Sequence, residues 1–154
     1  MMDTFELDEI TVVGLALNST TTNENGRSGI ECGNLWQKFS LEKYADLIPN
    51  KLDEDILAIY HSYEGNHNAP FSYFIGCKVS AGTAAPDGMD QLIVPKGKYK
   101  KFIAAGEIPA CITDTWNKIW NSNIGRAYKA DFEVFDERTK GWKNAMVDIF
   151  ISVV

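Results

Sequence analysis

Aromatic side chains carry the clearest binding chemistry in this sequence. The chain holds eight Phe, six Tyr and four Trp, together 12% of its residues. Aromatic rings offer large apolar surfaces and attract cations over their faces, and Tyr and Trp add a hydrogen-bonding group. There are enough rings to build a core and still line a cavity, so the composition favours a site for a small organic molecule.

Residues that hold metals, bind phosphates or perform nucleophilic catalysis form no recognisable pattern. His61 and His67 flank an expected strand end and loop with only Glu64 as a nearby carboxylate, which favours surface positions over a metal site. The glycines lack the spacing of a nucleotide-binding loop, and no Ser-His-Asp or Cys-His order stands out. We therefore expect no metal and no cofactor.

The cysteines and the N-terminus indicate the compartment. Cys32, Cys77 and Cys111 are odd in number and have no Cys-x-x-Cys spacing, which is typical of reduced, buried thiols. The N-terminus lacks a basic segment followed by an apolar one, and no stretch of about 18 apolar residues occurs. We expect a cytoplasmic protein without membrane contact.

Length and charge limit the partners. A chain of 154 residues can form one compact domain over residues 1–154. Fifteen Lys and Arg against 21 Asp and Glu leave a net charge of -6, which repels phosphate backbones, so direct nucleic-acid binding is not expected. Because modest acidity also keeps a small protein soluble, the charge does not identify a ligand.

The first half, about residues 1–80, reads as strand, helix, strand, strand. Val, Ile and Leu dominate residues 5–17, and the polar segment 18–29 that follows is expected to be a mobile loop. Apolar residues at three- and four-residue spacings predict a helix over 35–48, stopped by Pro49. Two strands joined by a hairpin loop follow, at residues 56–63 and 71–79.

The second half, about residues 91–154, repeats this order after a Gly- and Pro-containing linker. It predicts a strand over 92–104 interrupted by Pro95 and Gly97, a helix over 108–120, and strands over 128–136 and 145–154. The segments Leu35-Trp36-Gln37-Lys38-Phe39 and Thr115-Trp116-Asn117-Lys118-Ile119 match in Trp and Lys. The fold class is therefore α+β, a pseudo-twofold tandem of two β-α-β-β units with antiparallel strands and two main helices.

A cleft is expected where the two halves meet, because such junctions are favoured ligand sites. Trp36 is expected mainly in the core, whereas Trp116 or Trp120 could face the cleft. Tyrosines near strand and hairpin positions are candidate walls whose hydroxyls could hold polar groups of a ligand: Tyr60, Tyr63, Tyr73, Tyr99 and Tyr128.

The segment 128–136 is ambiguous by periodicity. Alternation places Phe132 and Val134 on one face of this strand and Asp131, Glu133 and Phe135 on the other. By itself, the second face reads as solvated, which predicts a surface position for Glu133.

Four short motifs resemble the GyrI-like effector-binding domains, which occur alone, as integron cassette proteins and as sensor modules of multidrug-responsive regulators. In chain order these are Tyr73-Phe74-Ile75-Gly76, Val94-Pro95-Lys96-Gly97-Lys98-Tyr99, the run from Trp116 to Trp120, and Asp131-Phe132-Glu133-Val134-Phe135-Asp136. Their order and spacing extend the resemblance over nearly the whole chain, and the last motif is the most specific.

The resemblance implies an aromatic pocket with a buried glutamate at Glu133 that faces the positive charge of amphipathic drugs or dyes. An ionised carboxylate in an apolar site is costly without a partner, so such a pocket selects ligands that bring a cation or a donor. On this basis the expected ligand-binding residues are Glu133, Trp116, Trp120, Tyr73, Tyr60, Tyr99, Phe135 and Trp36.

Three functions remain open. The first is a stand-alone receptor for an amphipathic, cationic aromatic compound, acting as a homodimer or with a separate regulator protein. The second is a hydrolase of small reactive electrophiles that uses Glu133 as general base, since some GyrI-like proteins resemble hydrolases. The third is inhibition of a DNA topoisomerase, which the family name suggests; the scattered negative charges do not favour it.

Overall fold

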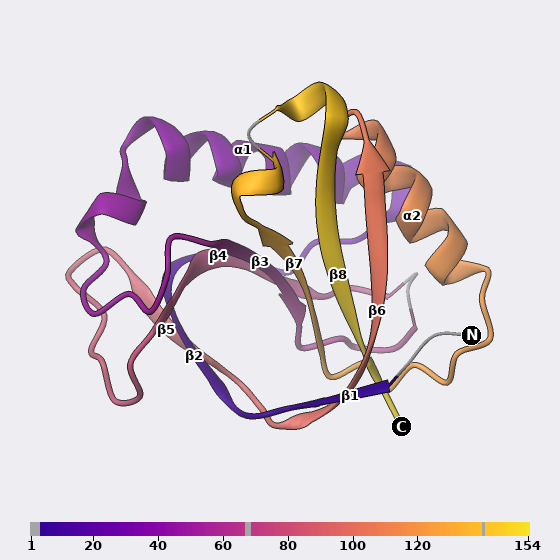
Figure 1. Cartoon of the computed structure of the whole chain (residues 1–154), viewed down its shortest axis with the longest axis horizontal. Helices are drawn as coiled ribbons and strands as arrows, with labels where there is room; N and C mark the ends of the chain where they lie inside the picture. Colours follow the sequence, from indigo (N-terminus) through magenta and orange to yellow (C-terminus); the bar gives the residue numbers. More distant parts are fainter. Residues whose placement is uncertain (1–3, 67–68, 140) are drawn as a thin grey trace.

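The structure, a computed structural model, describes residues 4–66, 69–139 and 141–154. Its two α-helices lie on one side of a curled sheet (Figure 1). The elements are β1 (Thr4–Leu7), β2 (Ile10–Ala16), α1 (Arg27–Leu41), β3 (Ile56–His61), β4 (Ser72–Val79), β5 (Asp90–Val94), β6 (Gly97–Gly106), α2 (Ala110–Trp120), β7 (Ala130–Phe135) and β8 (Ala145–Val153), with short 3-10 turns at Glu24–Gly26, Tyr44–Leu47, Glu137–Thr139 and Trp142–Asn144. No described helix is long and apolar enough to cross a membrane.

One sheet contains the strands of both halves. Its order is β1-β6-β8-β7-β3-β4-β2-β5, and each pairing is antiparallel. The set β6-β8-β7 of the second half mirrors the set β3-β4-β2 of the first, and the two sets meet where β7 pairs with β3. The α+β tandem of two β-α-β-β units predicted from the sequence is therefore confirmed.

The first strand of each half is longer in the prediction than in the structure. Residues 5–17 form β1 and β2, with Asp8 and Glu9 between them, and residues 92–104 fall into β5 and β6 around Pro95, which has no N–H to donate. In each half the first of these two strands pairs with a strand of the other half: β1 pairs with β6, and β5 pairs with β2. Because β1 and β2 are almost continuous yet lie near opposite ends of the strand order, the sheet has to curl.

Helix α1 begins earlier and ends earlier than the sequence predicted. It starts at Arg27, inside the expected loop, after Gly26 adopts a left-handed conformation with φ 69°. It ends at Leu41, and Lys43 with φ 54° separates it from the 3-10 turn Tyr44–Leu47. The face toward the sheet carries Cys32, Leu35 and Phe39, a three- and four-residue spacing that buries one stripe of the helix.

The core has layers on both faces of the sheet. Inside the curl, side chains such as Leu57, Phe74 and Phe132 pack together. On the helix side one cluster packs under α1 and another under α2, and Tyr60 and Phe135 contact both clusters. These two rings thus mark the seam between the halves.

Candidate functional site

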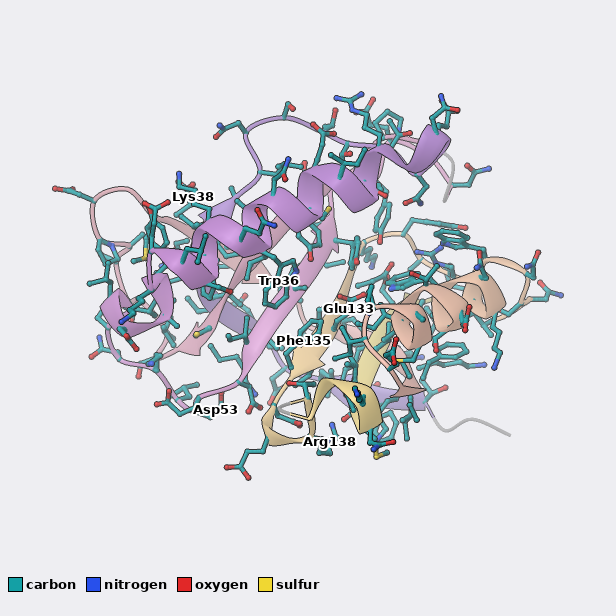
Figure 2. All side chains as sticks on the ribbon, turned by 90° about the horizontal axis from the view of Figure 1, so that it is seen from above. Trp36, Lys38, Asp53, Glu133, Phe135 and Arg138 are labelled. Carbon is teal, nitrogen blue, oxygen red and sulfur yellow. The ribbon has the colours of Figure 1, made fainter. Side chains whose placement is uncertain are left out.

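Glu133 lies at this seam, between the two helices (Figure 2). It is on β7 opposite Ala58 of β3, and only 2% of the residue is exposed. Its Oε2 accepts hydrogen bonds from the Trp116 indole Nε1 at 2.7 Å and from the Tyr60 hydroxyl at 3.0 Å. Among the described residues, Oε1 accepts no hydrogen bond and no cation pairs with the carboxylate.

Alternation along β7 explains the direction of this side chain, and the helices explain its burial. Phe132 packs inside the curl, while Glu133 and Phe135 point to the helix side, as the period of the strand predicts. That face is not solvated, because α2 covers it with Trp116 and α1 approaches with Trp36. The surface position that alternation alone predicted for Glu133 is therefore wrong.

Burial governs the ionisation of Glu133. Loss of water raises the pKa of the carboxyl from 4.5 to about 7, and the hydrogen bonds from Trp116 and Tyr60 oppose that rise. The neighbouring phenol responds in the same direction, because burial and the nearby Glu133 hold the pKa of Tyr60 well above its ordinary value. Near neutral pH, Glu133 can therefore exist in either charge state.

Aromatic rings surround the carboxylate. Tyr60 contacts Trp116 and Tyr73 with ring centroids 5.0 Å apart in both cases. Tyr73 accepts a hydrogen bond at 2.7 Å from Trp36 Nε1, and the Trp36 ring meets Phe135 edge-on at 4.8 Å. Each of these rings packs against or hydrogen-bonds to its neighbour, so the walls of the site are apolar and restrained in position.

Two adjoining cavities open between the helices. The larger, of about 770 Å³, is lined by Trp36, Tyr60, Tyr73, Glu133 and Phe135 among others. The smaller, of about 290 Å³, is lined by Tyr60, Tyr63, Trp116, Trp120 and Arg126 among others. Both cavities share Gly29, Cys32, Tyr60 and Ile112.

Seven of the eight residues expected at the site from the sequence thus line one or both cavities. Tyr99 does not: it is buried inside the curl, where its ring meets Phe132 at 5.6 Å and its hydroxyl donates to the Pro95 carbonyl at 3.3 Å. Its place in β6 directs it to the face opposite the helices. Tyr128 stays near the smaller cavity through an edge-on contact with Tyr63 at 5.6 Å.

A buried ion pair beside the smaller cavity escaped sequence analysis. Asp131, fully buried, accepts from Arg126 Nη2 at 2.7 Å, from the Tyr63 hydroxyl at 2.6 Å, and from the backbone and hydroxyl of Ser152. The Arg126 guanidinium lies over Tyr128, 4.3 Å from the ring centroid. Arg126 follows Gly125 in an irregular segment, where no periodicity could reveal its partner.

The histidines do not enter this site in the described part of the chain. His61 Nδ1 is 2.9 Å from the Ser62 hydroxyl, and burial lowers the pKa of its ring. His67 lies outside the described residues.

The chain resembles proteins of known family over its whole length. Residues 5–153 match Cass2, the integron-associated effector binding protein family. The chain is similar to an integron cassette protein from the mobile metagenome of Vibrio cholerae, which has a crystal structure. The two share 29% sequence identity and superpose with a TM-score of 0.75, and the match covers 99% of this chain and 95% of that chain. The protein YobU of Bacillus subtilis (strain 168), whose name assigns it a provisional role in transcription regulation, is 24% identical over 77% of both chains.

A more distant structure shares the fold. SAV2435, solved bound to tetraphenylphosphonium, has a TM-score of 0.78 at 18% identity and covers 100% of this chain and 94% of that chain. The effector-binding resemblance predicted from the four motifs is thus confirmed by the match over residues 5–153. The chain belongs to the family of integron-associated effector-binding proteins.

Proposed function

We propose that this protein is a receptor for small amphipathic compounds that combine aromatic rings with a positive charge. One observation carries the proposal. Glu133 is 2% exposed, lines a cavity of about 770 Å³, and has neither a described cation beside it nor a described donor on Oε1.

The charge preference follows from the cost of burial. A carboxylate in an apolar site loses its hydration, and two donors on Oε2 replace only part of that loss. A ligand cation that reaches Oε1 supplies the missing partner. Rings such as Trp36, Tyr60 and Phe135 add dispersion and cation-π attraction.

The relatives support this proposal. The family is defined by effector binding, and SAV2435, which shares the fold, was solved with an aromatic phosphonium cation. Tetraphenylphosphonium is therefore a suitable first probe, and triphenylphosphine oxide is a neutral compound with similar rings.

The substitution Glu133→Gln tests the role of the charge. We expect tetraphenylphosphonium to bind less tightly by about 1.5 to 3 kcal/mol, because the substitution removes the Coulomb attraction between the carboxylate and the ligand cation. Triphenylphosphine oxide should change by less than about twofold, which is under 0.5 kcal/mol. Isothermal titration calorimetry on both ligands measures the difference.

Asp114→Asn is the matched control, since it removes one negative charge from the exposed side of α2, outside both cavities. It should leave both affinities unchanged. Equal losses for the cation and the neutral compound in Glu133→Gln would refute the charge role.

The same carboxylate supports a second candidate, a hydrolase of small reactive electrophiles. A pKa of about 7 makes Glu133 an effective proton acceptor near neutral pH, and Oε1 could take a proton from a water that attacks the electrophile. The measurement is diol formation from styrene oxide. A hydrolase should form diol well above the rate of the Glu133→Gln variant, and equal rates in the two proteins would reject catalysis.

A further inference from the structure

The wall of the larger cavity is acidic beyond Glu133. Four further carboxylate residues line it: Glu54, Asp55, Asp136 and Glu137. Among the described residues that line this cavity, none is Lys, Arg or His. The cavity therefore concentrates negative potential in a partly apolar enclosure.

Two of these carboxylates are already paired. Asp136 holds Arg138 through contacts of 2.9 to 3.2 Å, and Arg138 also reaches Asp148 at 2.7 Å. Glu54, largely exposed, pairs with Lys51 at 3.1 Å. Their charges are thus partly offset within the protein.

Asp55 and Glu137 form no ion pair with a described residue, and Asp55 is the one of the two that directly precedes β3. Asp53, two residues earlier in the chain, pairs with Lys78 at 3.0 Å. Partial burial and the negative charge of Asp53 raise the pKa of Asp55, and the positive charges of Lys78 and Arg138 oppose this rise without cancelling it. A positive group brought by a ligand would relieve this repulsion.

Asp55 and Glu133 line the cavity at different points along β3. Asp55 directly precedes β3, whereas Glu133 lies opposite Ala58, three residues further along that strand. At about 3.3 Å per residue, the two positions are about 10 Å apart along the strand. The wall between them is apolar, because Ile56 and Phe135 form a cross-strand pair there.

Figure 2 shows the region around Glu133 and Phe135 from above. Glu133 lies between the helices, and Phe135 lies on the side of Glu133 toward Asp53 and Arg138. In this view the Phe135 side chain lies between Glu133 and Asp53.

Building on the proposed function, we propose that the larger cavity binds elongated dications. One positive group contacts the open Oε1 of Glu133, the second contacts Asp55, and an apolar spacer of about 10 Å lies along Ile56 and Phe135. Two features carry the inference independently. Glu133, which is 2% exposed, offers an oxygen without a described donor, and Asp55 offers a carboxylate that forms no ion pair with a described residue.

Hexyltrimethylammonium and hexamethonium test the proposal, because they share one quaternary head and the same chain and differ in the second head. Calorimetry on the full chain should find that hexamethonium binds at least about threefold more tightly than hexyltrimethylammonium, as expected for one partly exposed ion pair. In Asp55→Asn this advantage should disappear, while the affinity for hexyltrimethylammonium stays within about twofold.

Asp53→Asn is the matched control. It changes the net charge equally, in the same loop, but at a residue that does not line the cavity and is paired with Lys78. The advantage of hexamethonium should survive in this variant. Equal affinities of the two ligands for the wild-type protein, or equal effects of the two substitutions, would overturn the second cation position.

Tetraphenylphosphonium separates the two proposals. If it binds wild-type protein and depends on Glu133 while hexamethonium gains nothing from Asp55, the receptor function stands and the dication inference fails. If tetraphenylphosphonium does not bind and Glu133→Gln changes neither quaternary ligand, the receptor function fails together with the inference.

Discussion

At the scale of residues, Glu133 balances opposing influences. Burial favours the neutral acid, whereas the Trp116 indole and the Tyr60 hydroxyl favour the carboxylate. The result is a pKa of about 7, at which a small change of pH alters the charge of the site. The proposed receptor function and the alternative hydrolase function both depend on this one side chain.

Cation binding should therefore depend on pH. Only the ionised carboxylate attracts tetraphenylphosphonium, so affinity should rise by about tenfold between pH 6 and pH 8, as the ionised fraction does for a pKa near 7. Calorimetry across this range measures the effect. A Glu133→Gln variant should bind with an affinity that varies little with pH, and a wild-type affinity that is equally flat would contradict the assignment.

The stability of the ligand-free protein should fall as the pH rises, whereas the affinity for a cation should increase. The pKa of Glu133 is higher in the folded chain than in the unfolded chain, so the folded state binds more protons between about pH 4.5 and pH 7. The contribution of Glu133 to stability is then fully present below pH 4.5 and is lost as the pH rises through 7. Urea unfolding at several pH values should show a smaller loss over this interval in Glu133→Gln.

At the scale of elements, the close approach of β2 and β4 depends on two glycines. Gly14 and Gly76 are directly paired, and a Cβ at Gly76 would lie 2.3 Å from the backbone oxygen of Val13. Since β4 also carries Tyr73, a displacement of this strand would reach the aromatic wall of the site.

We expect Gly76→Ala to lower the free energy of unfolding by about 1 to 3 kcal/mol, because the new methyl group must displace backbone. Gly33→Ala is the control: its Cβ would meet nothing within 4 Å, and alanine within α1 should raise stability by about 0.5 to 1 kcal/mol. Urea denaturation of both variants measures the sign of the change in the free energy of unfolding. An unchanged midpoint for Gly76→Ala would show that the strands have more freedom than the structure indicates.

At the scale of the whole molecule, the site exists because the halves share one sheet. Trp36, Tyr60 and Tyr73 come from the first half, whereas Trp116 and Glu133 come from the second. Strand β1 of the first half pairs with β6 of the second, and β5 of the second half pairs with β2 of the first. These pairings connect the two ends of the sheet and curl it. Neither half alone contains both the carboxylate and the full aromatic wall.

The amino-acid sequence by itself determined the elements, their repeated order, and the face of β7 that Glu133 shares with Phe135. The period of hydrophobic residues and the positions of turn residues predict these features, because the features depend on residues that are neighbours along the chain. Four motifs, in their order and spacing, also resemble the family that the match over residues 5–153 shows.

Tertiary structure alone decided which faces are covered. Alternation could not tell that α2 buries Glu133, that Arg126 pairs with Asp131, or that Tyr99 points into the curl instead of the cavity. The position of Asp55 at the cavity wall likewise depends on the pairing of β3 with β7. The physical reason is that period reports which residues share a face, whereas burial and charge pairing depend on elements distant in the sequence.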